Sequence, residues 1–148
     1  MLDPRRRDFV ALLGAAAVWP LAAHPAGKRR RIGVLTLLSA QDERGWVAAF
    51  VAGMRELGYV AGQTVDIDYR YTDGDTERLR PLARELIALV PDVIFAPEPT
   101  SARAVRALAP NVPIVCPTLG DHLHDLFASY ARPGGSVTGV AINVGTGA

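Results

Sequence analysis

The sequence has little cysteine, few aromatic residues and none of the common catalytic motifs. Cys116 is its single cysteine among 148 residues, so no intrachain disulfide can form and packing must stabilise the fold. Aromatic residues make up only 7% of the chain, which predicts an aliphatic core. The motifs GxSxG, GxxxxGK[ST], HExxH and CxxC are absent. We therefore predict no catalytic residues, no metal site and no cofactor.

Charge of either sign is not in large excess. The formal net charge is +1, and the first eight residues contain three arginines and two aspartates. Without those eight residues, 13 basic and 13 acidic residues remain. Nucleic-acid binding needs a basic face, so this balance argues against it. The remaining basic cluster, Lys28–Arg31, is interpreted as a solvated lead-in to the first strand.

The first 26 residues have the features of an export signal peptide. Arg5–Arg7 form a basic start, and the apolar stretch Phe9–Ala23 follows. That stretch has about 15 residues and is interrupted by a proline, so it is short for a helix that must cross ~30 Å of bilayer. Cleavage after Ala23 and cleavage after Ala26 are both compatible with the small residues found there.

The order of residues in this leader also indicates an export route. Arg6 and Arg7 are followed by a variable residue and then by Phe9, which is similar to the twin-arginine motif. An ordinary Sec leader can also carry several arginines, so both routes stay open. No cysteine lies near the cleavage region, which excludes a lipid-anchored lipoprotein. We expect a free periplasmic protein.

Strand-like and helix-like patterns alternate after residue 28. Ile32–Leu38 is an apolar run, as expected for a strand that is buried on both faces of a parallel sheet. Thr64–Tyr71 alternates apolar and polar residues, which predicts a strand at the sheet edge. The other predicted elements are helices at about 42–57, 79–90, 100–109 and 123–130, and strands at 92–96, 114–116 and 137–142.

This alternation predicts an α/β fold. Five strands that alternate with helices in about 120 residues indicate a doubly wound parallel sheet. Right-handed crossovers then place helices on both faces of that sheet. We assign the domain to residues 28–142 and the last residues, 143–148, to a tail.

Polar residues follow three of the buried strands, where a doubly wound sheet binds its ligands. Hydroxyl groups and free N–H groups at helix N-termini suit a small anion such as a carboxylate, and an aspartate suits a ligand ammonium group. Each hydroxyl residue is also a good N-cap without a ligand, so the prediction applies to the cluster rather than to each member. The predicted ligand-binding residues are Ser39, Thr100, Ser101, Thr118 and Asp121, with Asp121 for the ammonium group.

Two other polar features are given structural interpretations. His122 and His124 are two positions apart, so on a helix they point to different sides and do not readily share one metal ion. Cys116 stands in an apolar strand and is interpreted as an inert buried thiol, because reactive thiols need an electropositive, exposed setting.

Three stretches of the chain resemble the substrate-binding proteins of ABC transporters, whose relatives take up aromatic or branched amino acids. They are Arg31–Leu35, Phe50–Tyr71 and Ala131–Val140, which contains A-R-P-G-G-S-V-T-G. The resemblance implies a lobe of the type I periplasmic-binding-protein kind with strand order 2-1-3-4-5. It also implies ligand contacts from the loops after strands one, three and four, an amino acid or similar small solute, and an ABC permease as membrane partner.

The resemblance also sets an expectation about length. Members of that family have a second lobe after the fifth strand, so this chain is expected to be a truncated form with the N-terminal lobe only. A single lobe leaves the solute exposed on one side, which predicts weak binding. The alternatives are a flavodoxin-like or response-regulator-like domain, and a sensory lobe without a transport role. The leader argues against the first, as does the absence of an acidic cluster at 37–39.

Overall fold

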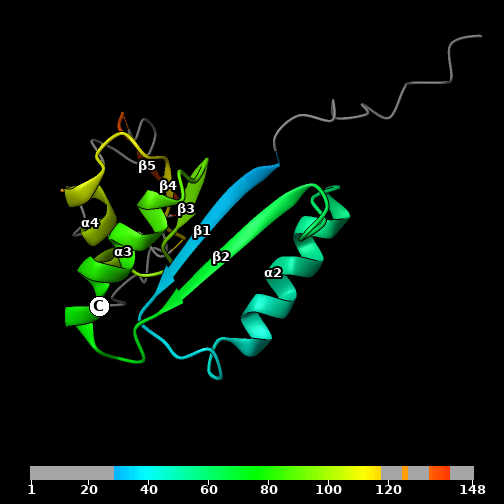
Figure 1. Cartoon of the computed structure of the whole chain (residues 1–148), viewed down its shortest axis with the longest axis horizontal. Coiled ribbons are helices and arrows are strands. Elements are labelled where there is room, and N and C mark those ends of the chain that lie inside the picture. The colour runs from blue at the N-terminus through cyan, green and yellow to red at the C-terminus, as the bar shows by residue number, and fades with distance from the viewer. Residues whose placement is uncertain (1–28, 118–124, 127–133, 141–148) are drawn as a thin grey trace, which may run out of the picture.

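The computed structural model describes residues 29–117, 125–126 and 134–140 (Figure 1). The predicted signal peptide, the tail and most of the predicted helix at 123–130 lie outside the described residues. Within the described ranges, no helix combines the length and apolar character needed to cross a membrane. The elements are β1 (Arg30–Thr36), α2 (Arg44–Glu56), β2 (Val65–Tyr71), the 3-10 helix η1 (Thr76–Arg78), α3 (Leu79–Ala88), β3 (Val93–Phe95), α4 (Pro99–Leu108), β4 (Ile114–Val115) and β5 (Val137–Thr138).

The five strands form one parallel sheet in the order β2-β1-β3-β4-β5, which confirms the predicted order. The register places Ile32 beside Ile67 of β2 on one side and beside Val93 of β3 on the other. The β2 strand lies at the sheet edge, as its alternating sequence predicted. The strands β3, β4 and β5 are shorter than predicted, with two or three residues each.

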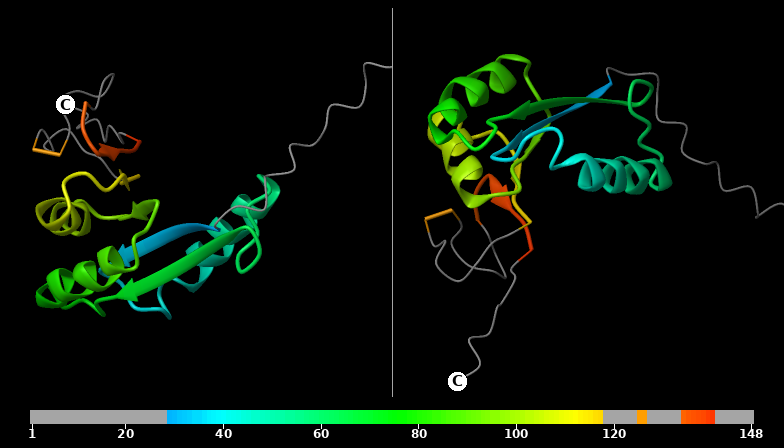
Figure 2. Two further views of the ribbon diagram at one scale, coloured as in Figure 1. Left: turned by 45° about the horizontal axis from the view of Figure 1, so that its top comes forward. Right: turned by 90° about the horizontal axis from the view of Figure 1, so that it is seen from below.

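The two faces of the sheet have separate apolar cores. Leu35 of β1 packs in a cluster with Leu86 of α3 and Val105 of α4. Ile32 and Val34 of β1 point the other way, into a smaller cluster that includes residues of α2. The helix α2 therefore covers one face, and α3 and α4 cover the opposite face (Figure 2). This arrangement follows from the period of two along β1, which sends successive side chains to opposite faces.

The face covered by α2 is less completely buried than the other. None of the residues of α2 is fully buried. An apolar groove of about 400 Å³ lies between α2 and the neighbouring strands, and Phe50, Phe95 and Val115 are among its lining residues. Trp46 stacks on the sheet residue Phe95, as expected for a core residue, but 36% of its surface remains exposed.

The two helices that follow β1 and β3 do not begin at the predicted capping residues. Ser39 and Asp42 instead hydrogen-bond to each other in the turn before α2, and Glu43 is the N-cap. Pro99 occupies the first position of α4, which places Thr100 and Ser101 inside its first turn. Proline is favoured at that position because it has no N–H to satisfy, and this moves the helix start upstream. Neither N-cap makes a side-chain capping bond.

Two glycines of the α2 region are expected to respond in opposite ways to alanine. Gly53 lies inside α2, and a Cβ there meets nothing within 4 Å. Gly53→Ala should therefore raise the free energy of unfolding by up to about 1 kcal/mol. Gly58 ends the helix at φ 87°, so Gly58→Ala should lower it by about 1 kcal/mol. Urea unfolding of both variants measures the two changes. If both substitutions changed the free energy of unfolding in the same direction, this account would be contradicted.

Candidate functional site

The candidate site lies at the carboxyl ends of β1 and β3. The chain leaves β1 toward β2 on one side and later returns to β3 on the other side, so strand order reverses between these two strands. Their following loops lead to α2 on one face and to α4 on the opposite face. In sheets of this kind the loops diverge at this place and leave room for a ligand.

Thr36, the last residue of β1, joins the two loops. Its side chain is fully buried, and its Oγ1 lies 2.7 Å from Oε1 of Glu43, the residue before α2. The same Oγ1 lies 3.0 Å from Oε1 of Glu98, in the loop after β3. It also accepts a hydrogen bond from the backbone N–H of Leu38 at 3.2 Å. One hydroxyl group therefore stands between two carboxyl groups from different loops.

Glu98 turns its carboxylate back toward β1 instead of capping α4. Its Oε2 accepts hydrogen bonds from the Leu37 backbone N–H at 3.3 Å and from the Ser101 hydroxyl at 2.9 Å. Ser101 is fully buried, so its hydroxyl depends on this protein partner. The Glu98 side chain thus holds the loop after β3 against the end of β1.

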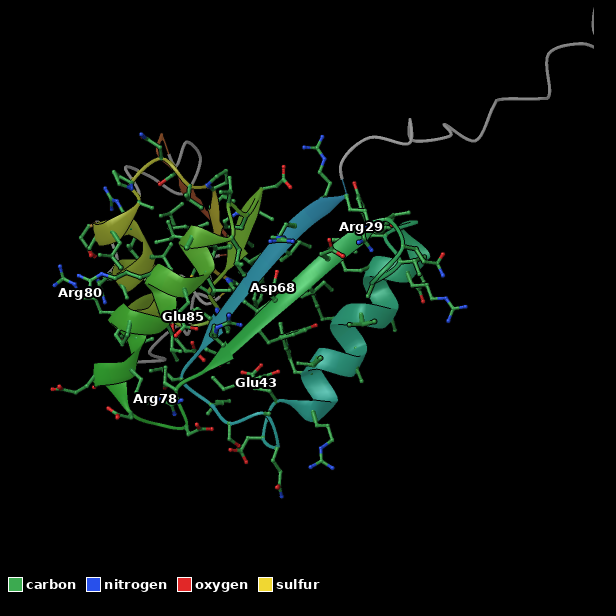
Figure 3. The ribbon with its side chains drawn as sticks, viewed as in Figure 1. Arg29, Glu43, Asp68, Arg78, Arg80 and Glu85 are labelled. Atoms are coloured by element: carbon green, nitrogen blue, oxygen red, sulfur yellow. The ribbon has the colours of Figure 1, made fainter. Side chains whose placement is uncertain are left out.

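Glu43 is the most unusual member of this group. The residue is only 4% exposed, and its Oε2 is buried without a hydrogen-bond partner. Figure 3 shows it between the first turn of α2 and the ends of β1 and β2. Burial raises the pKa of the Tyr71 phenol, and the Glu43 carboxylate raises it further. The Tyr71 ring stacks on Tyr69 with centroids 6.1 Å apart.

An aromatic cluster on the α2 side of the sheet includes residues that are near Glu43 and Glu98 in the sequence. The ring of Trp46 stacks on Phe50 at 5.3 Å and on Phe95 at 4.9 Å between centroids. Trp46 follows Glu43 by three residues along the chain, and Phe95 precedes Glu98 by three. The candidate site therefore has one buried carboxyl group, that of Glu43, one half-buried carboxyl group, that of Glu98, and a partly exposed aromatic ring.

Only one of the five predicted site residues takes part in this junction, two lie elsewhere, and two lie outside the described residues. Ser101 takes part in the site, through Glu98. Ser39 lies in the loop after β1, and its hydroxyl donates to Asp42 at 2.6 Å. Thr100 is exposed in the first turn of α4. Thr118 and Asp121 lie outside the described residues.

Three residues of the candidate site, Thr36, Glu43 and Glu98, are not among those predicted from the sequence. Two of them carried a signal, because Thr36 is the single hydroxyl in an apolar strand and Glu98 stands between two prolines at a strand end. The sequence predicted hydroxyl groups that bind an anion at the carboxyl ends of the strands. The structure has the carboxyl groups of Glu43 and Glu98 there. No set of three or more His, Cys, Asp or Glu side chains that could hold a metal ion occurs in the described part of the chain.

Comparison with known families decides the assignment. The family profile described as "ABC transporter substrate binding protein" matches residues 31–145. The chain belongs to this family. ABC transporter substrate-binding proteins bind solutes and are not enzymes. The match does not support the flavodoxin-like alternative. No protein of curated function matches the sequence.

Solved structures show the fold of this substrate-binding protein. An ABC domain in complex with L-Trp from Streptococcus pneumonia is 24% identical with TM-score 0.68, and the match covers 77% of this chain and 39% of that one. A substrate-binding protein with adhesive properties from Clostridium difficile, in an open, ligand-free form, is 24% identical with TM-score 0.67, over 74% and 38%. A conserved domain protein from Vibrio cholerae is 23% identical with TM-score 0.69, over 77% and 39%.

The coverage and the identities decide what these similarities show. The chain spans about two fifths of the length of the solved relatives, which corresponds to one lobe of a periplasmic binding protein. At these identities the likeness shows the fold alone. The predicted α/β lobe is confirmed, while the predicted ligand-binding residues remain predictions.

Proposed function

We propose that this protein captures a small organic solute, such as an amino acid, for an ABC importer. The observation that carries the proposal is the junction of the loops after β1 and β3 through Thr36, Glu98 and Ser101. The partly exposed ring of Trp46 stands in the first turn of α2, which follows the first of these loops. Doubly wound sheets bind their ligands at this position. The L-Trp complex of the pneumococcal relative supports an amino acid as the class of solute.

The partner and the compartment belong to the same proposal. An importer component of this family delivers its solute to an ABC permease in the membrane, and a periplasmic location makes that delivery possible. The basic start and short apolar stretch of the first 26 residues support export by a twin-arginine or Sec route. The solute itself and the permease are to be identified by experiment.

A ligand screen tests the proposed binding function. Thermal unfolding of the protein with each of the twenty amino acids should reveal at least one that raises the melting temperature by several degrees. Binding at 100 times Kd adds about 2.7 kcal/mol to the free energy of unfolding, which is enough for such a shift. If Asp121 binds the ammonium group, as the sequence pattern predicts, Asp121→Ala should abolish the shift. A screen in which no amino acid changes the melting temperature would count against this solute class.

The predicted leader is tested by N-terminal sequencing of the protein from periplasmic extracts. The first residue should be His24 or Gly27, after cleavage at one of the two predicted sites. Replacing Arg6 and Arg7 by lysine should stop export if the twin-arginine route is used, and should leave a Sec route intact. Recovery of the chain from the cytosol with Met1 intact would contradict export.

A further inference from the structure

We propose that an ammonium group of the solute binds to the carboxyl groups of Glu43 and Glu98 and to the Thr36 hydroxyl between them. These three side chains are here named the carboxylate pair with its bridging hydroxyl. This inference rests on the proposed function and adds the charge of the solute to it. It also moves the ammonium position from Asp121, where the sequence pattern placed it, to the junction of β1 and β3.

The first support is a count of donors. The Thr36 hydroxyl has one proton, but its oxygen lies within hydrogen-bond distance of two carboxyl oxygens, at 2.7 Å and 3.0 Å. The Leu38 N–H donates a hydrogen bond to the Thr36 oxygen and none to the carboxyl groups. With both carboxyl groups ionised, one of the two contacts is therefore left without a donor. A positively charged group with several N–H donors corrects this deficit.

The second support is the unpartnered oxygen of Glu43. Its Oε2 is buried and has no hydrogen-bond partner, and the whole residue is only 4% exposed. Buried acceptors are normally paired, so each exception needs an explanation. An ammonium group carries three donors, which can serve Glu43 Oε2 together with an oxygen of Glu98. Glu98 is only half-buried, so the pair is not closed off from solvent on that side.

The protein itself offers no cation for this pair among its described residues. The arginines that form ion pairs do so with other acids, among them Arg31 with Asp68, Arg70 with Glu85 and Arg78 with Asp73. The N-termini of α2 and α4 interact favourably with nearby negative charge, but they carry only partial charges. Two ionised carboxyl groups at one place repel an anionic ligand and attract a cationic one. A cationic group is therefore the class of ligand that suits this pair.

The aromatic cluster provides the matching surface for the rest of the solute. Trp46 lies within one turn of Glu43 on α2 and leaves 36% of its surface exposed. A tryptophan face attracts a nearby cation and also contacts an apolar or aromatic body. Because the chain has two tryptophans, Trp19→Phe makes Trp46 fluorescence a direct report of binding at this place.

The experiment compares amines with acids of the same shape on the full chain that carries Trp19→Phe. Isopentylamine, 4-methylpentanoate and L-leucine are followed by Trp46 fluorescence. Tryptamine, indole-3-propionate and L-tryptophan are followed by titration calorimetry, because indoles fluoresce in the same range as Trp46. We expect at least one amine to bind with a Kd within about tenfold of its parent amino acid. The corresponding acid should bind at least 100-fold more weakly.

Substitution of Glu43 connects this selectivity to the pair. Glu43→Gln should weaken amine binding at least tenfold, because the amide brings its own donor and removes the charge. The same variant should not lower the melting temperature of the free protein, since it relieves the proton deficit. Glu56→Gln is the matched control at an exposed position of α2 and should leave binding unchanged. If Glu43→Gln fails to fold, the comparison of amines with acids decides.

The remaining outcomes separate the two proposals. If the amino acids bind but the acids match the amines, or Glu43→Gln leaves Kd unchanged, the ammonium site is wrong and the binding function stands. If neither the parent amino acids nor the full amino-acid screen shows binding, the proposed function itself fails. If CaCl2 or NaCl without any amine raises the melting temperature in a Glu43-dependent way, the pair is a metal-ion site and this inference is overturned.

Discussion

Glu98→Ala should lower the free energy of unfolding by about 2 kcal/mol, one of the two largest effects expected from a single substitution in this chain. The Glu98 carboxylate accepts from the Leu37 N–H and from the hydroxyl of Ser101, which is fully buried. Alanine removes the acceptor and leaves both donors unsatisfied, which costs roughly 1–3 kcal/mol for a buried group. Urea unfolding followed by circular dichroism measures the loss.

A second substitution tests that explanation. Ser101→Ala in the Glu98→Ala background removes the unpaired hydroxyl, so part of the lost stability should return. Glu77→Ala is the control, because Glu77 is an exposed acid at η1. Strict additivity of Glu98→Ala and Ser101→Ala would show that the two side chains do not depend on each other, contrary to their hydrogen bond.

The architecture was predictable because it follows from local patterns. The apolar run of β1 indicated a strand buried on both faces, and its alternate residues do pack in two separate cores. The alternation along β2 indicated an edge strand, which the strand order confirms. The helix starts were less predictable. The carboxylate of Glu98 accepts from the Leu37 N–H and from the Ser101 hydroxyl rather than from a backbone N–H of the first turn of α4, and only the tertiary structure reveals this choice.

Polar side chains do gather at the carboxyl ends of β1 and β3, and Ser101 is one of the predicted residues among them, while ligand binding there stays a prediction. The residue types at this place were less predictable. Glu43 was missed because a glutamate before a helix is normally solvated. Glu43 is buried where its carboxyl group meets the Thr36 hydroxyl at the end of β1, a contact that no local pattern encodes. The position of Thr36 depends in the same way on residues distant in sequence, Tyr71 as its partner in β2 and Glu98 in the loop after β3.

Leu86→Ala is expected to lower the free energy of unfolding by about 3 kcal/mol, within the range for leucine truncation in a packed core. Leu86 is 1% exposed on α3 and lies over Gly33, where a Cβ would meet its Cδ2 at 3.4 Å. Gly33 has no side chain to fill the space, so a cavity remains. Leu57→Ala is the control, because Leu57 is 74% exposed. Urea unfolding with an unchanged m-value measures both. A loss below about 1 kcal/mol for Leu86→Ala would mean that α3 moves to close the cavity.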